Sequence, residues 1–127
     1  MNNDITVSKD ISKVFRGMDP NCLYGPIINN VAGMPDADFL NGWIYAISKE
    51  CLRDVGLFDP NFLVNWFEDA DYSFRARKAG YHLRTLDIEG MGLHHLGKDR
   101  PDWEGHRSKY KDIYDRNKEY LMEKHNV

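Results

Sequence analysis

The sequence has few of the features that mark secreted, membrane-spanning or zinc-binding proteins. Its two cysteines, Cys22 and Cys51, lie far apart, without C-x-x-C spacing or an adjacent histidine, so we expect reduced thiols rather than a disulfide or a zinc site. The longest apolar runs, such as WIYAI, are much too short to span a membrane. The N-terminal MNNDITVSKD lacks the apolar core of a secretory signal, and we therefore expect a cytoplasmic protein.

The chain also lacks an excess of basic charge. Its 17 Lys and Arg residues are outweighed by 20 Asp and Glu residues, which gives a formal net charge of −3. Nucleic-acid binders usually carry a basic face, so we expect no nucleic-acid partner. Hydrophobic residues make up 42% of the 127 positions, enough for one core in a chain of ordinary domain length. We therefore predict a single domain over residues 1–127.

Short apolar patterns predict strands that alternate with helices. Strands are expected at 5–7, at 22–30 with an interruption at Gly25 and Pro26, at 42–48, at 81–88 and at 90–97. Helices are expected at 8–17, 49–56, 68–79 and 102–125, and a loop at 29–38. This alternation indicates the α/β class, although the strands are too few for a complete doubly wound sheet.

Three carboxylates are crowded into the stretch NWFEDADYSFRARKAG, at Glu68, Asp69 and Asp71. One interpretation is helix electrostatics, because acidic residues in a first turn gain about 0.3–1 kcal/mol each from the helix dipole. Asp71 can also pair with Arg75 at the i,i+4 spacing. The other interpretation is a ligand site at the mouth of an α/β sheet, where a carboxylate can take a proton from a hydroxyl group.

The surrounding segment NGWIYAISKECLRDVGLFDPNFLVNWFEDADYSFRARKAGYHL favours the second interpretation. It resembles the acceptor-side half of inverting family 2 glycosyltransferases of the GT-A fold, and it is also similar to the galactosyltransferase C-terminal domain. The shared blocks are a strand after a glycine, Val55-Gly56, Phe58-Asp59, Glu68-Asp69, and a histidine after the next strand. The opening NNDITV resembles the segment that starts with the family's metal-binding D-x-D motif, and YDRNKEYLMEKH resembles its arginine-asparagine helix.

The resemblance implies a partial GT-A fold, a short mixed sheet flanked by helices. It divides the chain into a metal-motif segment and linker at 1–40, an acceptor and catalytic segment at 41–97, and a C-terminal helix at 98–127. The family's nucleotide-binding half precedes the metal motif and is absent from this sequence. We therefore expect a half-domain that is incomplete or inactive alone, and that forms a homo-oligomer or pairs with the missing half through an open sheet edge.

The resemblance also implies a reaction, the transfer of a sugar with inversion from a nucleotide-diphosphate sugar to the hydroxyl of a carbohydrate acceptor. Asp69 matches the general base that deprotonates the acceptor, and Glu68 matches the residue that hydrogen-bonds it. Trp66 would be a platform for a sugar ring. At the family level the process is polysaccharide biosynthesis.

A divalent cofactor, Mn²⁺ or Mg²⁺, is implied as well, because a metal neutralises the departing diphosphate. By the same match Asp4 is the principal carboxylate ligand, Asn2 holds the weaker first position of the motif, and His94 completes the site. His95 could replace His94. Adjacent residues of a strand point to opposite faces, so both histidines cannot readily bind one ion.

Two other functions stay open at this point. The chain could be a non-catalytic interaction module, a relic half-domain that binds a partner chain. It could also be a metal-dependent hydrolase that uses Asp4, Asp69 and His94. Each residue also has an ordinary interpretation: Asp4 as a turn residue, Trp66 as core, and the two histidines as one buried and one exposed imidazole.

Overall fold

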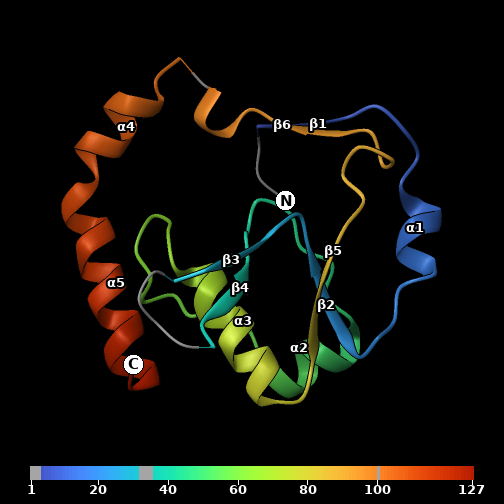
Figure 1. The fold of residues 1–127 in the computed structure, drawn as a ribbon, viewed down its shortest axis with the longest axis horizontal. Helices are drawn as coiled ribbons and strands as arrows, with labels where there is room; N and C mark the ends of the chain where they lie inside the picture. Colours follow the sequence, from blue (N-terminus) through green and yellow to red (C-terminus); the bar gives the residue numbers. More distant parts are fainter. Residues whose placement is uncertain (1–3, 32–35, 100) are drawn as a thin grey trace.

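The computed structural model describes residues 4–31, 36–99 and 101–127, which form a mixed α/β arrangement with five α-helices (Figure 1). The strands are β1 (Ile5–Val7), β2 (Cys22–Gly25), β3 (Ile28–Asn30), β4 (Asp38–Leu40), β5 (His82–Thr85) and β6 (Leu93–His95). The helices are α1 (Ser12–Arg16), α2 (Lys49–Val55), α3 (Glu68–Lys78), α4 (Trp103–Lys109) and α5 (Lys111–His125), with a 3₁₀ turn at Gly97–Asp99. The predicted α/β class is confirmed at this level.

The described strands form three two-stranded sheets. β1 pairs antiparallel with β6, β2 pairs parallel with β5, and β3 pairs antiparallel with β4. In Figure 1, α3 lies near the middle of the molecule, α1 and α5 lie on opposite sides, and β1 and β6 run along the top. The β1–β6 pairing therefore places residues 5–7 next to residues 93–95, just before the segment that leads into α4.

Three predictions about elements are wrong. Residues 42–48 do not form a strand; among the described residues they make a single bridge, Tyr24 to Ala46, and their apolar character reflects burial of Trp43 and Ile44. An apolar run looks the same in a buried irregular segment as in a strand. The predicted loop at 29–38 begins and ends in the β3–β4 pair, and residues 32–35 within it lie outside the described residues. The long C-terminal helix is two helices that meet at Tyr110.

Other sequence signals are confirmed. The predicted helix at 49–56 is α2, which Gly56 ends with φ of 85°. Its N-cap was not predicted: the hydroxyl of Ser48 accepts from the Cys51 backbone N–H at 3.0 Å. Both cysteines are free and buried. Within the described ranges, no helix combines the length and apolarity needed to cross a bilayer.

α3 lies between two of the three hydrophobic clusters, and this packing fixes the position of its N-terminus. Tyr72 and Ala76 pack with Leu23 and Leu40 on one side. Ala70 packs on the other side in a cluster that includes Leu121 of α5. Because a core packed on two sides resists rotation of the helix, the side chains of its first turn have a defined direction.

Candidate functional site

The start of α3 borders a cavity of about 650 Å³. Its wall brings together segments that are distant in the sequence: Asp4 before β1, Phe39 of β4 with residues 41–43, residues 64–69, His95 of β6, and side chains from α4 and α5. Of the residues singled out from the sequence, Asp4, Trp66, Glu68 and Asp69 line this cavity, and so does His95.

The loop that leads into α3 has an unusual backbone. Val64, Trp66 and Phe67 have positive φ values of 65°, 71° and 70°. For residues with a side chain this left-handed region costs about 1–2 kcal/mol each, and most of all for a β-branched residue such as Val64. Strain of this kind persists only where surrounding contacts enforce it, and it is concentrated at functional sites.

Asn117 of α5 supplies those contacts. It is fully buried, and its side-chain nitrogen donates to the backbone carbonyls of Leu63, Asn65 and Trp66 at 3.0, 2.9 and 3.2 Å. Arg116 adds a donor to the Asn61 carbonyl at 3.1 Å. The loop therefore keeps its conformation because α5 satisfies its carbonyl groups. Beyond the family resemblance of the helix, no sequence pattern indicated this role for Asn117.

Asp69 is held in place by backbone groups. Its Oδ2 accepts from the Gly42 N–H at 2.9 Å, and its Oδ1 accepts from the Ala70 N–H at 2.8 Å. A Cβ at position 42 would lie 2.7 Å from the Cβ of Asp69, so the close approach requires glycine. Burial raises the pKa of Asp69, and the hydrogen bonds from Ala70 and Gly42 oppose that shift.

Glu68 has the opposite kind of surroundings. Its Oε2 is buried and has no hydrogen-bond partner among the described residues. Burial, and next the charge of Asp69, raise the pKa of Glu68 to about 7. A carboxyl group with this pKa can hold or release a proton near neutral pH, which is the property that acid–base catalysis requires.

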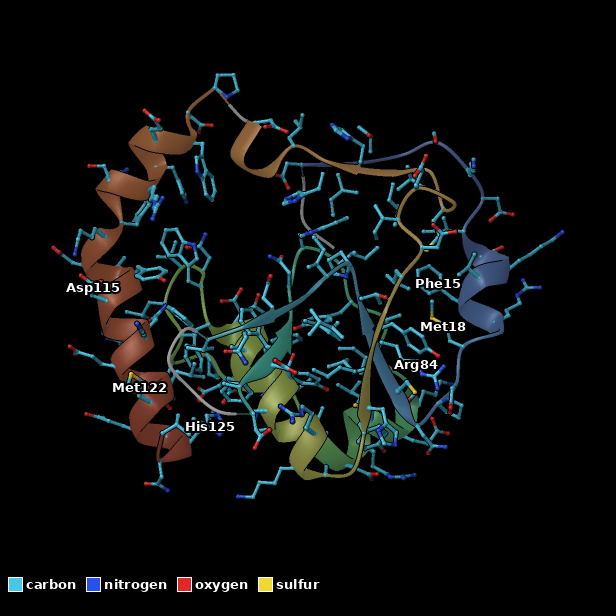
Figure 2. All side chains as sticks on the ribbon, viewed as in Figure 1. Phe15, Met18, Arg84, Asp115, Met122 and His125 are labelled. Carbon is cyan, nitrogen blue, oxygen red and sulfur yellow. The ribbon has the colours of Figure 1, made fainter. Side chains whose placement is uncertain are left out.

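Asp71 faces away from the cavity and is fully buried. It pairs with Arg75 at 2.9 Å, as the i,i+4 spacing predicts, and with Lys124 and His125 of α5 at 2.7 and 2.8 Å. His125 lies at the C-terminal end of α5, on the side that faces α3 (Figure 2). Burial by itself raises the pKa of Asp71. Hydrogen bonds from Lys124, His125 and Arg75 outweigh this effect and bring the pKa below its usual value. Asp71 therefore stabilises the fold.

Asp4 and His95 line the same cavity. His95 Nε2 lies 3.2 Å from Asp4 Oδ1, and the Gly97 N–H donates to Asp4 Oδ2 at 3.3 Å. The His95 ring stacks on Trp43 with a centroid distance of 4.7 Å. His94, the histidine first chosen from the sequence, points to the exposed face of β6 and does not line the cavity. The alternation of side chains along a strand accounts for this difference.

The metal ligands predicted from the sequence are only partly assembled among the described residues. No group of three or more His, Cys, Asp or Glu side chains is placed to hold a metal ion in the part of the chain that the structure describes, and Asn2 lies outside it. Asp4 and His95 nevertheless fit a divalent ion, because Asp4 Oδ1 is buried, has no hydrogen-bond partner among the described residues and lies 3.2 Å from an imidazole nitrogen. Carboxylate oxygen and imidazole nitrogen are ligands that Mn²⁺ accepts.

Trp66 belongs to a group of aromatic rings between the loop and the C-terminal helices. Its ring lies 5.8 Å from both His106 and Tyr114, and Tyr114 in turn contacts Phe67.

Comparison of the chain with protein family models, curated proteins and solved structures finds no match to its sequence or its fold.

Proposed function

We propose that the chain is the acceptor-side part of an inverting GT-A glycosyltransferase, which transfers a sugar from a nucleotide-diphosphate sugar to a carbohydrate hydroxyl. The observation that carries this proposal is the convergence of Asp4, His95, Glu68 and Asp69 on one cavity, although they are far apart in the sequence. This reaction requires both a divalent ion and a carboxylate in one cavity. The ion stabilises the negative charge of the leaving diphosphate, and the carboxylate takes the proton of the attacking hydroxyl.

In this proposal Asp69 is the general base. The Gly42 N–H fixes one oxygen of its carboxylate at 2.9 Å and so orients the group toward the cavity. As the acceptor oxygen forms its bond to the anomeric carbon, its proton passes to Asp69, and the bond from that carbon to the diphosphate breaks. Glu68, with a pKa of about 7, orients the acceptor by hydrogen bonding.

Asp4 and His95 would hold the divalent ion. His95 thus takes the role that the sequence first gave to His94. When bound, Mn²⁺ or Mg²⁺ supplies positive charge that stabilises the departing diphosphate. The hydrogen bond from the Gly97 N–H to Asp4 Oδ2 orients that carboxylate and leaves Oδ1 directed at His95.

The test is a Mn²⁺ titration followed by NMR, in which a bound paramagnetic ion broadens the signals nearest to it. We expect selective broadening around Asp4, His95 and Gly97, lost in Asp4→Ala and His95→Ala. His94→Ala is the matched control and should bind Mn²⁺ as the wild type does. Absence of selective broadening would contradict the proposal.

Asp69→Asn separates a transferase from a metal-dependent hydrolase. In the proposed transferase, assayed with a nucleotide-binding half of the same family added, this variant keeps Mn²⁺ binding and loses sugar transfer from a panel of UDP-, GDP- and dTDP-sugars. If Mn²⁺ binding disappears instead, Asp69 is a metal ligand and not a base.

A second candidate is a module that binds a partner chain without catalysis. It is favoured by the exposure of large apolar side chains near one another in the sequence, with Leu57 at 77% and Val64 at 64%. Such a module should self-associate, and sedimentation that shows a strict monomer at high concentration would count against it.

A further inference from the structure

A second cavity of about 500 Å³ adjoins the carboxylate cavity. It lies among the loop before α3, α4 and the start of α5. Its lining residues are Trp66, Trp103, Glu104, Arg107, Ser108, Lys111, Tyr114 and Asp115. Because Trp66, Trp103 and Tyr114 also line the carboxylate cavity, the same aromatic side chains form part of both walls.

The aromatic part of this wall is open to a ligand. Tyr114 is 41% exposed, Trp66 and Trp103 are half-buried, and no residue of α4 is buried. The rest of the wall is hydroxylic or charged, with the acids Glu104 and Asp115 balanced by Arg107 and Lys111. A pyranose ring needs this combination, since its C–H face packs on an aromatic ring while its hydroxyl groups hydrogen-bond to polar groups at the rim.

Other ligand classes fit less well. A lipid chain would leave four charged side chains facing hydrocarbon. A nucleic acid would meet as many carboxylates as cations. We propose that the second cavity is a saccharide-binding subsite, and that it holds sugar units next to the one at Asp69. The statement that these units belong to the acceptor depends on the proposed function, whereas saccharide binding itself does not.

Arg107 is the main polar anchor of this subsite. Lys111 is already paired with Asp115 one turn along α5. Across residues 4–31, 36–99 and 101–127, Arg107 forms no such pair, so its planar guanidinium group is available to two neighbouring hydroxyl groups or to a sugar carboxylate.

The three tryptophans of the chain allow a direct test by NMR. Trp66 and Trp103 line the second cavity, whereas Trp43 lines only the carboxylate cavity and is an internal control. The probes are maltotriose, cellotriose, triacetylchitotriose and trigalacturonate at millimolar concentration. We expect at least one trisaccharide to shift the indole signals of Trp66 and Trp103 by more than that of Trp43. Shifts at Trp43 alone, or no saturable shift with any of the four, would overturn the proposal.

Variants sharpen this result. Trp103→Ala should weaken binding of the active trisaccharide about tenfold or more, as loss of an aromatic anchor does. Arg107→Ala should also weaken it, whereas Lys109→Ala removes the same charge from the same helix outside the cavity and should not. Equal effects of Arg107→Ala and Lys109→Ala would show that charge alone, and not this cavity, binds the sugar.

The outcome is separable from that of the proposed function. Saccharide shifts at Trp66 and Trp103 without a Mn²⁺ site at Asp4 and His95 would keep the subsite and remove the transferase. A Mn²⁺ site without saccharide shifts would keep the transferase proposal and place its acceptor elsewhere.

Discussion

Three carboxylates within one turn of α3 have opposite surroundings. Glu68 and Asp69 border a cavity, contact no basic side chain among the described residues, and have raised pKa values. Asp71 is enclosed by Arg75, Lys124 and His125 and has a lowered pKa. The structural interpretation is confirmed for Asp71, which pairs with Arg75, whereas the ligand-site interpretation of Glu68 and Asp69 stays a prediction. The helix orients one carboxylate into the protein and the other two toward the cavity.

The largest effect is expected from Asp71→Asn. The substitution removes the counter-charge of Arg75 and leaves Lys124 with Asp59 alone, and breaking a buried ion pair in this way costs about 3–5 kcal/mol. Urea unfolding at neutral pH measures the loss. Because the pKa of Asp71 is lowered in the fold, its contribution is complete above the ordinary carboxyl value and is lost on acidification, so the difference from wild type should shrink in acid.

Asp115→Asn is the control for this prediction. It removes a carboxylate that is also paired at the i,i+4 spacing, with Lys111, but on an exposed face of α5. The variant should unfold at nearly the wild-type urea concentration. If Asp71→Asn and Asp115→Asn behaved alike, the enclosure of Asp71 would have no energetic consequence.

Asn117→Leu should cost about 2–4 kcal/mol, because three loop carbonyls lose their donor while the backbone strain before α3 remains. The variant should also lower the pKa of Glu68 toward its ordinary value as the loop relaxes. Glu119→Leu lies on the exposed face of the same helix and should change neither quantity. A Glu68 pKa that stays near 7 in Asn117→Leu would show that α5 does not hold the site.

Glu68→Gln should stabilise the fold at alkaline pH. The folded state binds the Glu68 proton more tightly than the unfolded state does, so ionisation of Glu68 costs folding free energy as pH rises from about 4.5 to about 7. Relative to wild type, Glu68→Gln should gain about 2–3 kcal/mol between about pH 4 and about pH 8. Thermal unfolding across this range checks it, and a gap that does not change with pH would contradict it.

The smallest effect is expected at two glycines. Gly42→Ala places a Cβ against Asp69 and should cost about 1–3 kcal/mol. Gly105→Ala meets no atom within 4 Å in α4 and should stabilise by about 0.5–1 kcal/mol. Opposite signs in thermal unfolding support the close approach of residue 42 to Asp69.

The sequence was most informative where a signal is local. The glycine after α2, the extent of α3 and the Asp71–Arg75 pair depend on neighbours within a few positions, and all were predictable. The apolar run at 42–48 was misread because composition does not distinguish a buried irregular segment from a strand. The two C-terminal helices were merged because no glycine or proline marks Tyr110.

The site was partly predictable for the same reason. Glu68, Asp69 and Asp4 were chosen from the sequence and line one cavity. Choosing between His94 and His95 requires the register of β6 against β1, which only the folded chain supplies. Asn117 and Gly42 act through backbone contacts with residues far along the chain, and such contacts leave no periodic pattern.

The most direct measurement is a carbon-detected NMR titration of the side-chain carboxyl groups. The account predicts that Glu68 titrates near pH 7 while Asp71, a few positions along the same helix, titrates below its ordinary value of 3.8. Titration of Glu68 near its ordinary value of 4.5 would contradict the claim that α3 separates an acid–base pair from a structural carboxylate.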